Sequence, residues 1–227
     1  MRSDVAVVVP VYNEEPIVAS VVTPLRAAFE HVICVNDAST DQSATAIAGT
    51  GAYLLNHPTN LGQGAALQTG MEFARLICGV RWVVTFDADG QHQIDDVTRM
   101  LHVAETTGVD VVLGSRFLDA TPVGMPRVKR LVLKAAIAFS NTVSGLRLTD
   151  THNGLRVLAR RVVDELQITL PDMAHASEII EIIAAKGYSY REVPVTITYS
   201  DYSRAKGQSI INAVNIAFDT LLRKVSR

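Results

Sequence analysis

The stretch VAVVVPVYNEE, residues 5–15, sets an unbroken apolar run directly before a polar turn. An apolar run without polar alternation is typical of a strand that is covered on both faces. Asn13 is suited to cap a following helix, and Pro16 is suited to the first turn of that helix. The opening of the chain therefore predicts a buried strand that ends in polar residues and leads into a helix.

The alternation of strand and helix continues along the first half of the chain. Helical stretches separate the later strands, and they include a short helix capped by Asp41 and a long helix within residues 61–77. Further strands are expected at residues 31–37, 52–56, 81–87 and 110–116. This order predicts an α/β fold with a mostly parallel, doubly wound, Rossmann-like sheet and right-handed crossovers. In such sheets, ligands bind beyond the carboxyl ends of the strands.

Beyond residue 116 the pattern is less regular, starting with a turn-rich, basic segment at residues 117–130. Because no linker, internal repeat or low-complexity segment interrupts the chain, we expect one domain of residues 1–227. Residues 1–116 would form a nucleotide-binding half, as in other doubly wound sheets, and residues 117–227 would form an acceptor half. The later elements are predicted as an apolar helix at 131–146, strands at 154–160 and 190–200, a helix at 175–187, and an amphipathic helix from 210 with a cationic end.

Composition narrows the class of protein. The chain has 227 residues, 48% of them hydrophobic, and a net charge of −2, which gives no basic face for a nucleic-acid partner. Cys34 and Cys78 lie in apolar runs without CxxC spacing, as expected of buried, reduced thiols. The first apolar run is too short to export or to span a membrane. We therefore expect a cytoplasmic protein whose membrane contact, if any, is peripheral, at the inner face of the cell membrane.

Two aspartates end the strand expected at residues 81–87. Asp87 and Asp89 are separated by one alanine, and Gly90, Gln91 and His92 follow them. Carboxylates so spaced can face one ion, and Mg²⁺ or Mn²⁺ prefers oxygen ligands and shares its shell with a diphosphate. The plainer interpretation is that Asp89 and Gly90 form a turn and that Asp87 caps a helix.

Other polar groups are expected at the same edge of the sheet. Asp37 ends the second strand and could accept hydrogen bonds from a base or a ribose, or could close an Asx turn over Ser39 and Thr40. Gly64 lies where the long helix begins, so that backbone amides could approach a ligand closely. Among the histidines, only His92 is a candidate by position; His57, His102 and His175 are expected to pack or to lie on the surface.

Basic residues follow the fifth strand. Residues 116–134 contain five cations, Arg116 and Arg130 among them, against the single acid Asp119. Arginines in a turn-rich segment suit phosphate binding, although a solvated basic surface is the usual reason for such a run. A second basic segment, residues 203–209, carries Arg204 and Lys206 and is suited to a flap that closes on a phosphate.

Six motifs in order resemble family-2 glycosyltransferases of the GT-A fold, most closely the dolichyl- or polyprenyl-phosphate sugar synthases. They are VVPVYNEE, VNDASTD, NLGQGAALQTG, DADGQH, GSR and TDTHNGLR, and the resemblance extends to about residue 210. It implies that the nucleoside is surrounded by Pro10, Tyr12, Asn13, Glu14 and Asp37. It also implies that Asp87 and Asp89, helped by Gln91, hold the metal and diphosphate. By the same analogy, Arg116 and Arg130 would face the acceptor or donor phosphates, with Arg204 and Lys206 on the closing flap, and residues 1–116 would be the nucleotide-sugar-binding half.

The chain departs from the family pattern in two ways. Many hydroxyl-directed members carry a Glu-Asp pair before a QxxRW helix, whereas Ser177 and Glu178 stand at about that place here. Larger polyprenyl-phosphate synthases carry C-terminal transmembrane helices, which this sequence does not show. Residues 131–146 and the final helix could lie on a bilayer or contact a membrane protein, or they could pack together or across a homodimer.

The chemical group of the acceptor that attacks the sugar decides what catalysis requires. A phosphate can attack without a base, whereas a hydroxyl gains ~10²–10⁴-fold from a positioned base, for which Glu178 and Asp150 are the candidates. We favour inverting transfer to a lipid-linked phosphate. Transfer to a saccharide hydroxyl in cell-wall or surface polysaccharide synthesis is the alternative, followed by a non-catalytic nucleotide-sugar binding module. A nucleotidyltransferase is disfavoured because the first strand lacks a glycine- and lysine-rich loop. The choice among UDP-, GDP- and dTDP-sugars stays open.

Overall fold

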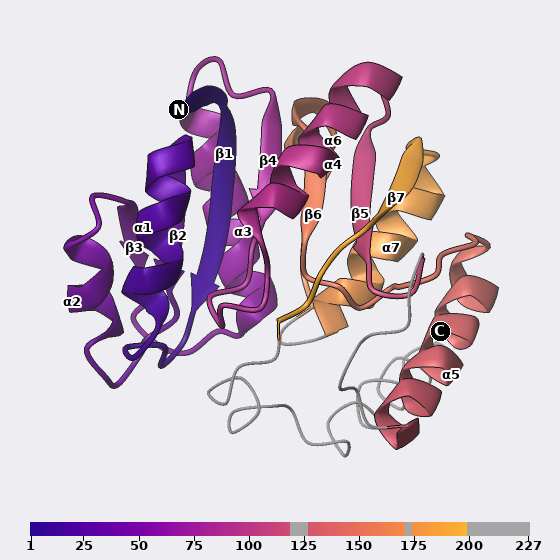
Figure 1. The fold of residues 1–227 in the computed structure, drawn as a ribbon, viewed down its shortest axis with the longest axis horizontal. Helices are drawn as coiled ribbons and strands as arrows, with labels where there is room; N and C mark the ends of the chain where they lie inside the picture. Colours follow the sequence, from indigo (N-terminus) through magenta and orange to yellow (C-terminus); the bar gives the residue numbers. More distant parts are fainter. Residues whose placement is uncertain (119–126, 171–173, 199–227) are drawn as a thin grey trace.

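The computed structural model describes residues 1–118, 127–170 and 174–198, which form one seven-stranded sheet with helices on both faces (Figure 1). The strand order is β3-β2-β1-β4-β6-β5-β7, and only β6 runs antiparallel to its neighbours. The strands are β1 (Arg2–Val11), β2 (Phe29–Asn36), β3 (Tyr53–Asn56), β4 (Trp82–Thr85), β5 (Val111–Ser115), β6 (Arg156–Ala159) and β7 (Tyr190–Pro194). The predicted α/β class and mostly parallel sheet are confirmed.

The helices divide between the two faces of the sheet (Figure 1). They are α1 (Val18–Ala28), α2 (Ser43–Ala48), α3 (Gln63–Leu76), α4 (Ile94–Thr107), α5 (Arg127–Ser144), α6 (Arg160–Glu165) and α7 (His175–Lys186). Helices α1 and α4 share one core with the sheet, and α3, α6 and α7 share the other. Within the described ranges, no helix is both long enough and apolar enough to cross a bilayer.

Strand β1 is buried on both faces, as its unbroken apolar run predicts. Val5, Val7 and Val9 point into the core beneath α1 and α4. Ala6 and Val8 point into the core beneath α3. Because successive side chains of a strand point to opposite faces, one run of valines joins the two cores. Burial of one such side chain contributes about 1.5–3 kcal/mol.

The turn after β1 differs from the prediction. Asn13 does not cap a helix, because α1 begins only at Val18. The Asn13 backbone has a φ of 53°, and its side-chain oxygen accepts a hydrogen bond from the N–H of Thr40 at 2.8 Å. Asparagine tolerates this left-handed conformation better than most residues. Asn13 therefore ties the end of β1 to the loop after β2.

Elements of the second half form close to their predicted places, with shifted ends. Helix α5 begins at Arg127, earlier than expected, and α7 ends at Lys186. Strand β7 ends at Pro194, although Val195 still donates a hydrogen bond to the carbonyl of Ser115. The short α6 was not predicted, and the helix expected from residue 210 lies outside the described residues. Asp41 does not occupy the N-cap of α2 itself but accepts from the N–H of Ser43 at 3.0 Å.

Helix α3 lies so close to the sheet that Gly70 has no room for a side chain. A Cβ atom there would lie 2.3 Å from the Cγ1 atom of Val8. We expect Gly70→Ala to lower the free energy of unfolding by about 1–3 kcal/mol, because the strain exceeds the gain of about 1 kcal/mol in helix propensity. Urea denaturation measures the change. Gly49→Ala is the control, since its Cβ would make only an ordinary 3.6 Å contact and its φ is −68°. Equal stability of both variants would contradict the tight packing.

Candidate active site

Three neighbouring strand ends meet at one edge of the sheet, the lower edge in Figure 1. Strands β2, β1 and β4 are adjacent and parallel, so the residues that follow them lie together: residues 12–14, Asp37 and residues 87–89. The N–H of Asp37 donates to the carbonyl of Val11 at 2.8 Å. The N–H of Glu14 donates to Ser43 Oγ at 2.8 Å. The polar strand ends expected from the sequence are therefore neighbours.

Asp37 is buried and accepts three hydrogen bonds. Its Oδ1 accepts from the N–H of Leu61 at 2.9 Å and lies 2.7 Å from Nδ1 of His57. Its Oδ2 accepts from the N–H of Gly62 at 2.8 Å. The N–H of Ser39 donates instead to Oδ1 of Asn36 at 3.2 Å, so the Asx turn proposed for Asp37 is wrong.

His57 fixes the position of Asp37. Its Nε2 atom lies 2.9 Å from Thr69 Oγ1, so the ring bridges β3 and α3. Because a carboxylate only accepts, Nδ1 of His57 is the donor in the bond with Asp37. A carboxylate has about four acceptor positions, and the three bonds leave Asp37 one, on Oδ2.

Asp87 lies among polar groups from three elements. Its carboxylate accepts from Gln63 Nε2 at 3.0 Å and lies 3.0 Å from His92 Nε2. Burial raises the pKa of Asp87, but the hydrogen bond from His92 and the charge of Arg156 outweigh it, so the net pKa is lowered. Helix α4 begins only at Ile94, so Asp87 is not a helix cap. Of the histidines, His92 thus lies beside the predicted metal residue, as its place in the sequence suggested.

Asp89 stands in an environment that disfavours its charge. Burial first, then the carboxylates of Asp87 and Glu14, raise the pKa of Asp89 to about 6. Its Oδ1 accepts from the N–H of Gln91 at 3.0 Å, so Asp89 also closes a local turn. A cation placed between Asp87 and Asp89 would relieve this repulsion. The turn interpretation and the metal prediction are therefore compatible for Asp89.

The carboxylates at this site fit a hard divalent ion whose coordination shell is completed by a bound ligand. Among the described residues, no cluster of three or more His, Cys, Asp or Glu side chains could hold a metal by itself. Mg²⁺ and its analogues are often held by one or two carboxylates, with phosphate oxygens and waters as the other ligands. Asp87 and Asp89 supply such a pair. Gln91 as a third ligand stays a prediction, since the hydrogen bonds that Gln91 makes to Asp89 and Thr198 are through its backbone.

Gly154 makes room for the Asp87 carboxylate. A Cβ atom on Gly154 would lie 2.2 Å from Asp87 Oδ2. Gly64 is likewise needed for packing, because a Cβ there would lie 2.2 Å from the carbonyl oxygen of Leu170. Protein atoms occupy the space where a Cβ of Gly64 would stand. That backbone amides near Gly64 approach a ligand stays a prediction.

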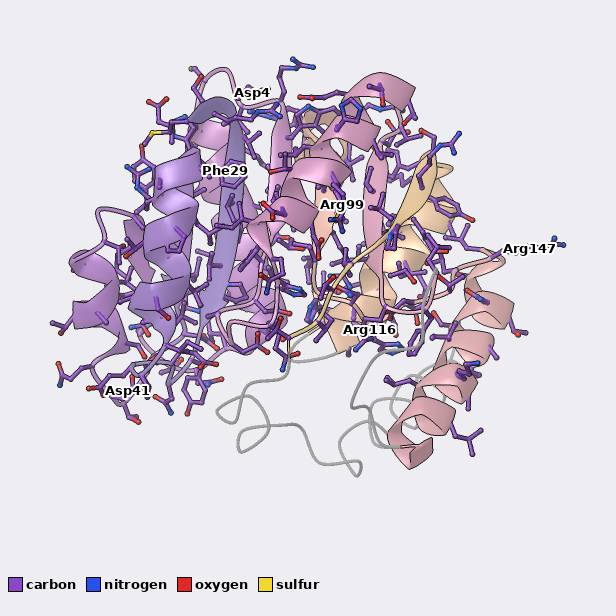
Figure 2. The ribbon with its side chains drawn as sticks, in the orientation of Figure 1. Asp4, Phe29, Asp41, Arg99, Arg116 and Arg147 are labelled. Atoms are coloured by element: carbon purple, nitrogen blue, oxygen red, sulfur yellow. The ribbon has the colours of Figure 1, made fainter. Side chains whose placement is uncertain are left out.

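Arg116 and Asp150 form a buried ion pair beyond the end of β5, at the same lower edge where Figure 2 labels Arg116. Arg116 Nε and Nη2 donate to the two carboxylate oxygens at 2.6 and 2.8 Å, and the Arg116 N–H adds a third bond. Burial raises the pKa of Asp150, but Arg116 outweighs it and lowers the net pKa. A carboxylate so paired is a poor proton acceptor, which argues against Asp150 as the general base.

Glu178, the other candidate base, is also engaged. Its carboxylate accepts from the N–H groups of Thr169 and Leu170 at 3.0 and 2.9 Å, and from the Thr169 hydroxyl. Glu178 thereby anchors the segment that contacts Gly64. The side chain of Arg130, and Arg204 and Lys206 entirely, lie outside what the structure describes. Pro10 and Tyr12 lie at the end of β1 as predicted, and the Tyr12 side chain is exposed.

Comparisons with known proteins agree with this architecture. Residues 6–165 match the model of glycosyl transferase family 2. A UDP-N-acetylglucosamine–dolichyl-phosphate N-acetylglucosaminyltransferase of Methanococcus voltae is 26% identical, over 97% of this chain and 96% of its own. A polyprenol monophosphomannose synthase of Mycolicibacterium smegmatis is 28% identical, over 92% of this chain and 83% of its own. Glucosyl-3-phosphoglycerate synthase of Mycobacterium tuberculosis, solved with Mg²⁺ and UDP, superposes with a TM-score of 0.74 at 17% identity, covering 99% of this chain and 79% of that one.

The mostly parallel sheet, with acids at the ends of β2 and β4, defines a glycosyltransferase of the GT-A fold. The chain belongs to glycosyl transferase family 2. The two named transferases also confirm the predicted similarity to the dolichyl- and polyprenyl-phosphate sugar synthases.

Gly154 offers a direct test of the site. We expect Gly154→Ala to displace the Asp87 carboxylate and to weaken Mn²⁺-dependent nucleotide binding about 10-fold, as is usual for residues that support a metal ligand. Isothermal titration calorimetry with Mn²⁺ and UDP measures this effect. Gly49→Ala, in the loop after α2, should bind like the wild-type chain. Unchanged affinity in Gly154→Ala would count against Asp87 as a metal ligand.

Proposed function

We propose that this glycosyltransferase moves a sugar from a nucleotide-sugar donor to a lipid-linked polyprenyl phosphate, with inversion at the anomeric carbon. The observation that carries the proposal is the engagement of both candidate bases. Arg116 holds Asp150, and the N–H groups of residues 169 and 170 hold Glu178. A phosphate oxygen already carries negative charge and needs no base, whereas a sugar hydroxyl does.

In the proposed reaction, an acceptor phosphate oxygen forms the new bond to the anomeric carbon while the bond to the nucleoside diphosphate breaks. A divalent ion at Asp87 and Asp89 would neutralise charge on the departing diphosphate. His92 and Gln63 hold the Asp87 carboxylate in place for this task. Arg116, with Arg130 of α5, would orient the acceptor phosphate by charge and hydrogen bonds. The names of the relatives from Methanococcus voltae and Mycolicibacterium smegmatis support this acceptor class.

The segment beyond β7 supports the predicted flap. Thr198, the last described residue of that stretch, donates its N–H to the carbonyl of Gln91 at 3.0 Å. Its hydroxyl accepts from Gln93 Nε2 at 3.2 Å. Arg204 and Lys206 follow Thr198 in the sequence by six and eight residues, outside the described residues. We propose that Arg204 and Lys206 contact the donor diphosphate.

The hydrogen bonds of Asp37 favour one class of nucleobase in the sugar donor. Uracil and thymine present a single imide N–H, which matches the one remaining acceptor position on Oδ2. Guanine presents two adjacent N–H donors that a carboxylate meets with both oxygens, and Oδ1 is already filled by His57 and Leu61. We therefore propose a UDP- or dTDP-sugar as the donor.

The acceptor is tested with Glu178→Gln and a set of acceptors. With polyprenyl phosphates and radiolabelled UDP-sugars, label should pass to the lipid phosphate, and Glu178→Gln should keep kcat within about threefold of wild type. If Glu178 were the general base, Glu178→Gln would instead lower kcat by ~10²–10⁴-fold. Polyprenols without phosphate and soluble saccharides are the control acceptors. Label on hydroxyls alone, together with a large loss in Glu178→Gln, would establish the hydroxyl alternative; binding without transfer would indicate a non-catalytic module.

The identity of the donor's nucleobase is tested by thermal shift with Mn²⁺ and UDP, dTDP or GDP. A nucleotide that binds only the folded chain raises the Tm of the chain by linkage. At 100 times its Kd, the nucleotide adds about 2.7 kcal/mol to the free energy of unfolding. We expect UDP or dTDP to raise Tm more than GDP at equal concentration. A larger shift with GDP would show that Asp37 does not select the base in this way.

A further inference from the structure

Glu192 is a half-buried carboxylate on β7, the strand at the edge of the sheet. Its Oε1 accepts from the N–H of Thr149 at 2.9 Å, from the Thr149 hydroxyl at 2.9 Å and from the N–H of Asp150 at 3.1 Å. Its Oε2 lies 3.0 Å from the same Thr149 nitrogen. Thr149 and Asp150 precede Glu192 by 43 and 42 residues, so one side chain fastens the backbone of a distant loop to β7.

The backbone that Glu192 holds carries the partner of Arg116. The Asp150 side chain is fully buried, and its two oxygens accept from Nε and Nη2 of Arg116 at 2.6 and 2.8 Å. A bidentate pair of this kind fixes the plane of the guanidinium as well as its place. Because Glu192 holds the N–H of Asp150, the orientation of Arg116 depends on Glu192 through two printed-out steps of direct bonding: Glu192 to Asp150, and Asp150 to Arg116.

A pair of hydroxyls connects Glu192 to the backbone around Arg116. The Thr149 Oγ1 atom lies 2.6 Å from Ser115 Oγ, which accepts from the N–H of Phe117 at 3.2 Å. Since Thr149 donates its one hydroxyl proton to Glu192, Ser115 is the donor to Thr149. Ser115 and Phe117 flank Arg116 in the sequence. The main chain on both sides of Arg116 is therefore tied to Glu192 as well.

Glu192 stands where its charge is disfavoured. Burial raises the pKa of Glu192, and the hydrogen bonds from Thr149 and Asp150 oppose that shift. Burial and the nearby Asp150 carboxylate outweigh these bonds, so the net pKa is raised. A partly buried carboxylate beside a second carboxylate adds little net stability. The hydrogen bonds of Glu192 are better explained by the position that they give to Asp150 and Arg116.

We propose that Glu192 is a positioning residue for the acceptor side of the site, which fixes the backbone of Thr149 and Asp150 and thereby aims the Arg116 guanidinium at the acceptor phosphate. This inference rests on the proposed function, which gives Arg116 to the acceptor. Its consequence is selective. Loss of the Glu192 carboxylate weakens acceptor binding and leaves nucleotide binding unchanged, because the nucleotide residues follow β1, β2 and β4, on the other side of β6.

The test measures two affinities by calorimetry: farnesyl phosphate, as a short polyprenyl phosphate, and UDP with Mn²⁺. Glu192→Met keeps the length of the side chain and removes both acceptor oxygens. It should weaken farnesyl phosphate about 10-fold, because a small misplacement of an orienting group is costly. Its affinity for UDP with Mn²⁺ should equal that of the wild type. Glu192→Gln keeps one acceptor oxygen and should fall between Glu192→Met and the wild type.

A double-mutant cycle shows whether Glu192 acts through Arg116. Arg116→Lys cannot form the bidentate pair with Asp150 and should weaken farnesyl phosphate by itself. In that background, Glu192→Met should add little further loss, because residues that act through one another are not additive. Losses that simply multiply would show that Glu192 acts independently of Arg116 and would overturn the inference.

The matched control is Glu181→Met, because Glu181 is an exposed glutamate in the middle of α7. It should leave both affinities unchanged. Melting temperatures separate binding defects from unfolding; if Glu192→Met does not fold, Glu192→Gln must weaken farnesyl phosphate by itself. A folded Glu192 variant that binds farnesyl phosphate like the wild type, or that loses UDP equally, overturns the inference. A wild-type chain that binds UDP but no farnesyl phosphate overturns the proposed acceptor instead, and the inference with it.

Discussion

The site depends on the burial of β1 between two parallel neighbours. Val7 and Val9 fill one core and Val8 fills the other, so β1 cannot shift by one residue without turning its apolar side chains to the wrong faces. The parallel pairing with β2 and β4 then brings the residues after these strands to one edge. The position of each acid relative to the others is thereby set by apolar packing well away from the edge.

The acids at that edge are then fixed by hydrogen bonds rather than by their own preferences. Asp37 accepts hydrogen bonds from two backbone N–H groups and from His57, and Asp150 forms an ion pair with Arg116. Asp89 has fewer compensating bonds, and it is the aspartate whose pKa burial and its acidic neighbours raise, to about 6. Because a buried charge without partners is expensive, the groups left with acceptor capacity are the ones suited to meet a cation or a ligand.

The sequence was sufficient to predict the first five strands and the meeting of their polar ends, because periodicity and turn residues are local signals. It could not predict which glycines make room for another part of the chain. Gly64 and Gly154 lie against Leu170 and Asp87, about 100 and 70 residues away in the sequence, and only the assembled fold brings these segments together. The burial of Arg156 could not be predicted for the same reason: within GLRVLAR, Arg156 is one polar residue of an ordinary strand. The division into donor and acceptor halves stays a prediction.

The antiparallel strand β6 separates two groups of polar residues at this edge of the sheet. A sheet built only of parallel strands would present carboxyl ends from β4 and β5 side by side. Here β6 separates them and begins at the same edge where they end, so Arg156 enters between the two strand ends. Asp87 follows β4, and Arg116 follows β5. The distance between the ends of β4 and β5 is therefore set by strand spacing, which side-chain motion does not alter.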